Sequence, residues 1–593
     1  MSPIARLGTM ALAGVLGVGL VGVQSEQAAA RAWAAGAGAT LGRSVASDVT
    51  SPEEALRVDR VPTPVPAWAT CHGGRLDCAK VTLPLDYNSP NGATVTIALA
   101  RLRATAPAGK RSPSLFVNPG GPGGSGIALV ARPTTFASAA LRATFDIVGF
   151  DPRGVGASQA VRCHATNNDQ AKTRAKSAFP FPVTKAQEQR HVAYSGLLAK
   201  NCSGAGRLLA GAMSTAQVAR DLELLRRAVG DDKLNYLGFS YGSVLGQQYA
   251  NLFPDRVRTM VIDGVVDARQ WAGTNDRPMF DRIRSGEATA RGLAELLKRC
   301  AAAGKERCPF AAAGAPASSF ETITKRLTAE PLKVPTGKAT SLTYRYNEHI
   351  ALTTAALYDD PVLATTLAAE VWTATSPSAS AAAKKKALAA IGKLAGSLGF
   401  GVARTAAAAS YDNTEEAQLG VMCSDGRHAA KATAWPALAA AADKGARHFG
   451  RMWSWMDSPC ATSVWKAKDE DAYRGPFDRV TAGPVLVVGN TWDPVTHPAN
   501  AVAIATLLPN SRMLGSDSWG HTAYGTSRCV TRAIDHYLVT GATDTVPRPD
   551  ALPPPGLVCM GDRQPYASPT LFDPPGGHRP ALPAPLPLMA VRG

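Results

Sequence analysis

The sequence is poor in charged and aromatic residues, which make up 18% and 6% of its 593 residues. It has fewer acidic residues than basic ones, 46 Asp and Glu against 63 Lys and Arg, which gives a formal net charge of +17. It lacks the cysteine and histidine spacing of zinc fingers and the aromatic pattern of RNA-binding domains. The basic residues are scattered, with one tight run at residues 384–386. We therefore interpret the positive charge as a solvated surface and expect no nucleic-acid partner.

Cysteine is absent before Cys71, which excludes a lipid-modified cysteine at an N-terminal cleavage site. No C-x-x-C occurs, which argues against a thioredoxin-like motif or a zinc ribbon, and we expect no metal site. The ten cysteines that are present form an even set, which in an exported chain is typical of disulfides. The sequence does not fix their connectivity. Pairing neighbours along the chain gives Cys71–Cys78, Cys163–Cys202, Cys300–Cys308, Cys423–Cys460 and Cys529–Cys559.

Long apolar stretches are also absent, except at residues 7–23, which follow Arg6 and precede three alanines ending at Ala30. This order of a basic, an apolar and a small-residue segment predicts a secretory signal peptide over residues 1–30, cleaved near Ala30. A membrane anchor is the alternative, but the small residues favour cleavage, and no later stretch could span a bilayer. We expect a secreted protein without a stable membrane anchor. Residues 31–66 are predicted to be a flexible N-terminal or pro-segment, and residues 562–593 a Pro-rich mobile tail.

Between these ends, short apolar strands alternate with helices. Strands are predicted at residues 114–117, 145–150, 234–239 and 257–266, and an amphipathic helix at residues 214–229. This repetition is typical of an α/β fold with a mostly parallel sheet covered on both faces. The pattern stops near residue 267, continues as an Ala-rich helical segment to residue 481, and resumes with a strand at residues 483–490. We therefore predict a core of residues 67–266 and 482–561, with a mainly helical cap, residues 267–481, inserted between its late strands.

Three residues in this core have the order and setting of a catalytic triad. Ser240 lies in G-x-S-x-G, between an apolar strand and a helix, which is the pattern of a nucleophile elbow. Asp493 follows the late strand, and His521 comes after the last one, which gives the Ser–Asp–His order of α/β-hydrolases. His521 would take the proton from Ser240, and Asp493 would orient the imidazole. Asp263 is a second candidate for the acid, and His497 is predicted to be structural.

A glycine-rich stretch at residues 120–126 follows the predicted strand 114–117. It matches G-x-G-x-x-G, but Pro122 removes an amide that a dinucleotide phosphate would need, and an exported protein rarely meets such cofactors. We interpret it instead as an oxyanion loop. The backbone N–H groups of Gly121 and of Tyr241, the residue after the elbow serine, would bind the developing negative charge. We expect no cofactor.

These motifs together resemble a known family. The stretches at residues 118–126, 149–158 and 234–242, the late Asp493 and the Gly-His-Thr at residues 520–522 are similar to those of secreted tripeptidyl aminopeptidases of Streptomyces-type actinomycetes. These are proline iminopeptidase-related serine peptidases with the α/β-hydrolase fold. The resemblance implies a cap over the active site and release of short peptides from free N-termini. The pairs Cys423–Cys460 and Cys529–Cys559 also fit this family.

An aminopeptidase needs an acidic group to hold the substrate's ammonium. The candidates in the predicted cap are Asp425, favoured because it lies beside a predicted disulfide, and Glu415 and Glu416. Asp151 and Arg153 are expected to brace the loop after their strand. We predict a secreted serine exopeptidase, acting as a monomer on peptide or protein N-termini and releasing short peptides, tripeptides by the resemblance. A secreted carboxylesterase with the same triad is the alternative, and a binding protein that has lost activity is a third reading.

Overall fold

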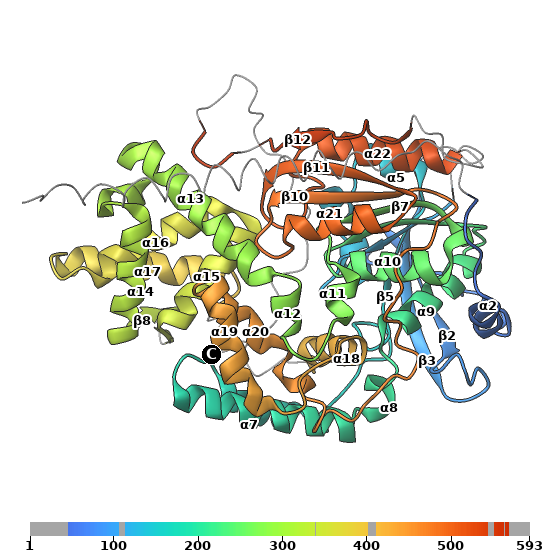
Figure 1. Ribbon diagram of the computed structural model, residues 1–593, viewed down its shortest axis with the longest axis horizontal. Coiled ribbons are helices and arrows are strands. Elements are labelled where there is room, and N and C mark those ends of the chain that lie inside the picture. Colours follow the sequence, from blue (N-terminus) through green and yellow to red (C-terminus); the bar gives the residue numbers. More distant parts are fainter. Residues whose placement is uncertain are drawn as a thin grey trace, which may run out of the picture.

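The computed structural model describes residues 46–105, 113–337, 340–400, 411–543, 551–562 and 564–567. The predicted signal peptide and residues 568–593 of the predicted tail lie outside them. The described chain forms a sheet with helices on both faces, together with a largely helical part beside it (Figure 1). None of the helices in these ranges is long and apolar enough to cross a membrane.

The central sheet has ten strands in the order β1-β2-β3-β5-β4-β6-β7-β10-β11-β12. The first three strands form an antiparallel edge that pairs with β5, and the remaining seven run parallel to one another. Their bounds are Ala69–Cys71, Leu76–Pro84 and Thr94–Leu102 for β1 to β3, then Leu115–Asn118 (β4), Ile147–Asp151 (β5), Leu234–Phe239 (β6), Val257–Asp263 (β7), Val485–Trp492 (β10), Ser511–Trp519 (β11) and Val558–Met560 (β12).

The central parallel strands are apolar throughout because both faces of the sheet are covered. Every residue of β4, β5 and β6 is buried, and alternate side chains enter different cores, Tyr236 on one face and Leu237 on the other. One face is covered by α9 (Thr215–Ala228), α10 (Gly242–Leu252) and α21 (Pro498–Leu507). The other is covered by α3 (Gly126–Val130), α5 (Ala139–Thr144) and α22 (Arg528–Thr543). This is the predicted class of sheet.

A long insertion separates two strands that are neighbours in the sheet. Strand β10 pairs directly with β7, in the register Val485 to Met260, although more than two hundred residues lie between them. We call the residues between these two strands the insertion. Its helices are α11 (Ala268–Ala272), α12 (Met279–Arg282), α13 (Ser285–Arg307), α14 (Pro316–Ala329), α15 (Tyr346–Asp359), α16 (Pro361–Thr375), α17 (Ala381–Ser397), α18 (Thr414–Asp425), α19 (Trp435–Gly445) and α20 (Phe449–Ser454).

The insertion is not wholly helical. Strands β8 (Leu332–Pro335) and β9 (Ser341–Tyr344) form a small antiparallel sheet of their own. Four-residue strands that pair only with each other give too short an alternation to be recognised within a helical segment. A helix from the first part of the chain, α7 (Lys185–Gly204), runs along the base of the insertion (Figure 1).

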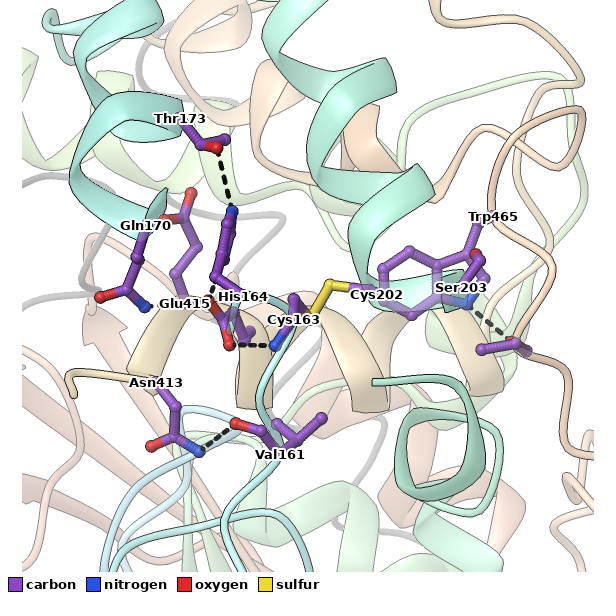
Figure 2. The surroundings of a disulfide bond; sticks show 12 residues. Val161, Cys163, His164, Gln170, Thr173, Cys202, Ser203, Asn413, Glu415 and Trp465 are labelled. Carbon is purple, nitrogen blue, oxygen red and sulfur yellow. Dashed lines mark hydrogen bonds and ion pairs between the residues drawn. A yellow bond between two sulfur atoms is a disulfide. The ribbon is translucent and has the colours of Figure 1, made fainter. Parts of the chain in front are cut away.

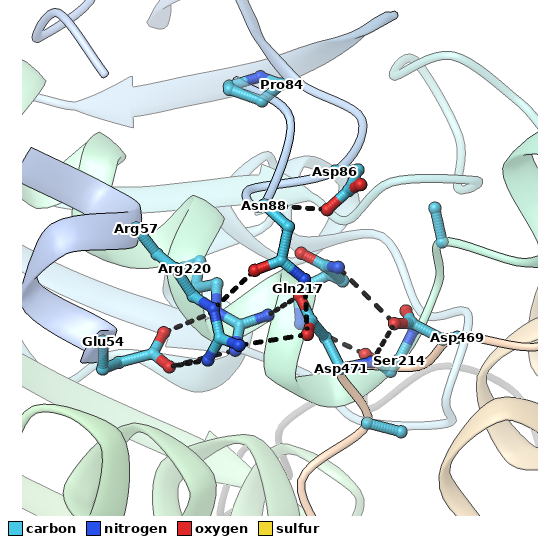
Figure 3. A network of polar contacts seen from close by, with 12 residues as sticks. Glu54, Arg57, Pro84, Asp86, Asn88, Ser214, Gln217, Arg220, Asp469 and Asp471 are labelled. Carbon is cyan, nitrogen blue, oxygen red and sulfur yellow. Dashed lines mark hydrogen bonds and ion pairs between the residues drawn. The ribbon is translucent and has the colours of Figure 1, made fainter. Parts of the chain in front are cut away.

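Part of the segment that we expected to be flexible, residues 31–66, is folded. Residues 52–59 form α2 (Pro52–Asp59), which starts with Ser51 as N-cap, proline in the first turn and two glutamates at the positive end of the helix. Its buried Glu54 accepts hydrogen bonds from Arg220 of α9 at 2.5 and 3.0 Å (Figure 3). The prediction of flexibility is therefore wrong for this part, because the short capped helix has an ionic anchor on the core.

The cysteines and the C-terminal residues complete the scaffold. All five disulfides join the cysteine pairs given above. Residues 564–567 of the predicted tail contact the core, since Gln564 donates a hydrogen bond to the carbonyl of Asp517 at 2.6 Å. The tail prediction is thus corrected for these residues.

Candidate active site

Ser240 occupies the turn between β6 and α10. Its φ of +56° lies in the left-handed region, which a residue with a side chain rarely adopts, and the turn is held by a 2.8 Å hydrogen bond from its N–H to the carbonyl of Asp263. A Cβ on Gly238 would lie 2.5 Å from the carbonyl oxygen of Gly242, and one on Gly242 would lie 2.9 Å from that of Asn118. The two glycines of G-x-S-x-G are therefore required sterically. Ser240 is partly exposed while its neighbours are buried.

His521 and Asp493 meet at the same edge of the sheet. The Nδ1 atom of His521 lies 2.8 and 3.0 Å from the two carboxylate oxygens of Asp493. Asn490 of β10 donates hydrogen bonds to the carbonyls on either side of His521, those of Gly520 and Thr522, at 2.9 and 3.2 Å. The other ring nitrogen of His521, Nε2, is buried and has no hydrogen-bond partner among the described residues. This nitrogen is the atom that a general base would use.

Asp493 is held in its charged form. Its burial opposes ionisation, but the adjacent His521, the hydrogen bond between them and the N–H groups of Thr522 and Thr496 outweigh this and lower the pKa of Asp493. Its Oδ1 accepts the N–H groups of Val495 and Thr496 at 2.8 and 2.9 Å. A carboxylate fixed in this way can orient an imidazole and stabilise its protonated form.

The second acid candidate, Asp263, has a different role. Its oxygens accept the N–H groups of Ala523 and Tyr524 at 2.8–3.1 Å, and burial raises its pKa to about 6. It therefore braces the loop after His521 and makes no hydrogen bond to the ring. The next residue, Gly264, lies close to the ring, since a Cβ added there would be 3.3 Å from Cε1 of His521. The imidazole therefore lies at the end of β7, the strand that pairs with β6 and whose last residue, Asp263, accepts the N–H of Ser240.

His497 is structural, as expected. It is the N-cap of α21, and its Nδ1 accepts the N–H of Ala499 at 3.2 Å. Burial lowers its pKa to about 3, and the positive charges of Arg284 and Arg291 add to this effect. A neutral imidazole is therefore retained at this helix end at physiological pH.

The glycine-rich loop packs against the elbow. A Cβ on Gly120 would lie 2.4 Å from the carbonyl oxygen of Phe239 and 3.0 Å from the backbone nitrogen of Tyr241, so only glycine allows this approach. Asn118 accepts the N–H of Gly120 at 2.9 Å. Within the described chain, the N–H groups of Gly121 and Tyr241 make no hydrogen bond. They remain the predicted oxyanion donors.

Asp151 and Arg153 brace this region, as expected. The carboxylate of Asp151 accepts the hydroxyl of Ser125, in the glycine-rich loop, at 2.5 Å and the N–H of Ala157 at 2.7 Å. The guanidinium of Arg153 is fully buried and is paired with Asp221 at 2.7 Å. Neither side chain is free to touch a substrate.

The structure does not support Asp425 as an amine-binding group. The side chain is 1% exposed, and it accepts hydrogen bonds from the N–H and hydroxyl of Thr215 at 2.7 and 2.5 Å and from the indole of Trp271 at 2.9 Å. Burial raises its pKa to about 6 against these hydrogen bonds. Thr215 is in turn hydrogen-bonded to the hydroxyl of Tyr241 at 2.6 Å. Asp425 therefore positions the residue next to the elbow serine.

Both glutamates of α18 are also engaged. Glu416 binds the ring of His164 at 3.0 Å and the N–H of Cys163 at 2.8 Å. Figure 2 shows His164 and Cys163 beside the Cys163–Cys202 disulfide. Burial opposes its charge, but these hydrogen bonds lower its pKa. Glu415 is paired with Arg174 at 3.4 Å and with the hydroxyl of Tyr194. The two glutamates thus hold α18 against the part of the chain that follows Cys163, which includes α6 (Asn167–Arg174) and α7. The prediction that they bind an amine gains no support.

Two residues of the site carried no signal in the sequence. The ring of Tyr358, at the end of α15, lies 4.7 Å from that of His521, and its carbonyl accepts the N–H of His521 at 2.9 Å. Gln418 lies on α18 above the glycine-rich loop. Both lie in the insertion, where nothing local in the sequence points to the sheet edge. Asn490 also supports the site, and the sequence did offer a signal for it, since it is a polar amide within a largely apolar strand.

Comparisons with known proteins show which families the chain resembles. Residues 113–293 match the family model of the alpha/beta hydrolase fold, and residues 446–551 match that of TAP-like proteins. The chain is 29% identical to the tripeptidyl aminopeptidase of Streptomyces coelicolor, over 79% of this chain and 82% of that protein. It is 28% identical to the serine protease Hip1 of Mycobacterium tuberculosis, over 82% and 88%. It is also 29% identical to carboxylesterase B of the same species, over 84% and 91%.

The fold and these similarities define the class of protein to which the chain belongs. The chain has the α/β-hydrolase fold and is an enzyme, a serine hydrolase. Within that class it is similar to the tripeptidyl aminopeptidases, which confirms the resemblance found in its motifs.

Proposed function

We propose that the protein is a secreted exopeptidase that releases short peptides, tripeptides in the first instance, from free N-termini. Ser240 is the nucleophile, His521 the general base and acid, and Asp493 the group that orients the imidazole. The observation that carries the proposal is the imidazole of His521. Asp493 holds one of its nitrogens, and the other has no hydrogen-bond partner among the described residues. The ring lies at the end of β7, which pairs with the strand that leads into Ser240. The similarity to a tripeptidyl aminopeptidase supports the choice of substrate.

The reaction proceeds in two steps, acylation of Ser240 and hydrolysis of the acyl-enzyme. The Oγ of Ser240 attacks the scissile carbonyl while Nε2 of His521 takes its proton, and the N–H groups of Gly121 and Tyr241 bind the oxyanion. The C–N bond breaks, and His521 gives the proton to the leaving amine. Water then attacks the acyl-enzyme, loses a proton to His521 and releases the short peptide with its new carboxyl group. The proton returns to Ser240.

Secretion is part of the proposal. The basic, apolar and small-residue segments of residues 1–30 support an exported chain. The five disulfides are also typical of an extracytoplasmic protein. Detection of the mature protein in culture medium, beginning after Ala30, would test this part.

The test compares three substrates on the purified enzyme. A tripeptide p-nitroanilide with a free amine should be cleaved, and its N-acetylated form should be cleaved much more slowly. A p-nitrophenyl ester of a short acid serves as the third substrate, because one relative is named a carboxylesterase. Ester turnover without cleavage of the free-amine peptide would favour the carboxylesterase. The Ser240→Ala variant is the control for contaminating activity.

A further inference from the structure

Gln418 of α18 is a fully buried amide with no hydrogen-bond partner in the part of the chain that the structure describes. Its exposure is 0%, and neither Oε1 nor Nε2 has a hydrogen-bond partner within the described residues. Buried amides are nearly always paired, because an unpaired buried donor or acceptor loses its hydrogen bonds to water. The unpaired amide of Gln418 therefore requires an explanation, which a bound substrate could supply.

The other buried polar side chains of α18 are all engaged. Glu415 and Glu416 hold the neighbouring helices, and Asp425 holds Thr215 and Trp271. The hydroxyl of Ser424 donates to the carbonyl of Ala210 at 3.2 Å. Gln418 alone among these described side chains contributes nothing to fastening the helix.

One end of α18 covers the glycine-rich loop. A Cβ on Gly123 would lie 3.4 Å from both the backbone nitrogen of Gln418 and the carbonyl oxygen of Thr414, and 3.6 Å from the Cβ of Ala417. Gly123 is two residues from Gly121, the predicted oxyanion donor. The backbone of Gln418 thus lies in the turn of α18 that is packed on this loop.

The other end of α18 reaches the elbow. Asp425 binds Thr215, whose hydroxyl contacts that of Tyr241, and it also binds Trp271, whose ring lies 5.6 Å from the ring of Tyr241. Thr414, Gln418 and Asp425 are separated by four and seven residues, so they share one side of the helix. Along α18, Gln418 therefore lies between Thr414, which is packed on the glycine-rich loop, and Asp425, which is linked to the elbow through Thr215.

We infer that Gln418 binds the backbone of a peptide substrate on the acyl side of the scissile bond. Its Oε1 accepts a peptide N–H or the terminal ammonium, and its Nε2 donates to a peptide carbonyl. One amide offers both the acceptor and the donors that a peptide unit needs. The inference rests on the proposed function and deepens it, because it assigns the preference for peptides over simple esters to this residue. A short ester has no peptide unit to fill the site, and the amide then stays unpaired.

The test uses Gln418→Met, which keeps the length of the side chain and removes its hydrogen bonds. The matched control is Gln248→Met, at another buried glutamine, on α10, whose Oε1 also lacks a partner among the described residues. Each variant is assayed with the free-amine tripeptide p-nitroanilide and with p-nitrophenyl acetate, and its Tm is recorded. We expect kcat/KM for the peptide to fall about ten- to a hundred-fold in Gln418→Met, with a much smaller fall for the ester and no fall in Tm. The control should show no such change in the peptide-to-ester ratio.

Two results would overturn the inference. Peptide turnover that stays at the wild-type level in Gln418→Met would show that the amide does not contact the substrate. An equal loss on both substrates together with a lower Tm would show a structural role. A wild-type enzyme that does not cleave the peptide would instead refute the proposed function, and this inference with it.

Discussion

The pKa values of two buried aspartates near His521 are shifted in opposite directions because the aspartates differ in contacts. Asp493 has the imidazole and several N–H groups around it, and its pKa is lowered. Asp263 has backbone N–H groups but no hydrogen bond to the imidazole, and burial raises its pKa to about 6. The environment thus favours the charged form of Asp493, the partner of His521, and disfavours that of Asp263, which braces the chain.

This difference gives a prediction for the matched pair Asp493→Asn and Asp263→Asn. An asparagine at position 493 cannot stabilise the imidazolium and favours the wrong tautomer, so kcat should fall by about 10³–10⁴-fold. An asparagine at position 263 still accepts hydrogen bonds from the loop, and kcat should fall by about ten-fold at most. Steady-state rates on the tripeptide p-nitroanilide measure both. Equal losses in the two variants would contradict the assignment of Asp493.

At the scale of elements, α2 anchors the chain before the first strand to the core. Glu54 is buried against Arg220, and Asp471, in the segment that leads from the insertion back to β10, lies 3.2 Å from the same guanidinium (Figure 3). The neighbouring Glu53 is 77% exposed at its side chain and is paired with Arg57 only at the surface. One helix thus carries a buried and an exposed ion pair at adjacent positions.

We predict that Glu54→Ala destabilises the fold by about 3 kcal/mol, because Arg220 loses a buried partner. Glu53→Ala is the control in the same helix, and its exposed pair should contribute less than about 1 kcal/mol. Urea unfolding monitored by circular dichroism measures both. A Glu54→Ala variant as stable as Glu53→Ala would mean that α2 is not anchored in solution.

The elements that the sequence predicted well are those with local signals. The apolar strands β4 to β7 and β10 were found because buried parallel strands are apolar on both faces. Ser240 was found because the elbow needs glycine at positions 238 and 242. Helix α2 was missed because its eight residues lie in an Ala- and Pro-rich context, although Ser51, Pro52 and the two glutamates form a helix start signal.

At the scale of the whole molecule, the insertion completes the site. Strands β7 and β10 pair in the sheet and fix the two ends of the insertion. The long chain between them is therefore free to lie over the carboxyl edge of the sheet. It places Tyr358 against His521 and α18 against both the glycine-rich loop and the contacts of Tyr241. The contacts of Tyr358 with His521 and of Asp425 with Thr215 join residues more than a hundred positions apart, which no local pattern encodes. The sequence could not show that the three amine-binding candidates are engaged elsewhere, because their partners Thr215, Arg174 and His164 come from the first part of the chain.

The most direct test of the central claim is the covalent intermediate. A tripeptide p-nitrophenyl ester with a free amine is mixed with the enzyme, quenched in acid within the first turnover and analysed by mass spectrometry after digestion. We predict the mass of one tripeptidyl group on the fragment that contains Ser240, and no added mass in Ser240→Ala. The absence of any adduct on this fragment, together with peptide turnover retained by Ser240→Ala, would contradict the account.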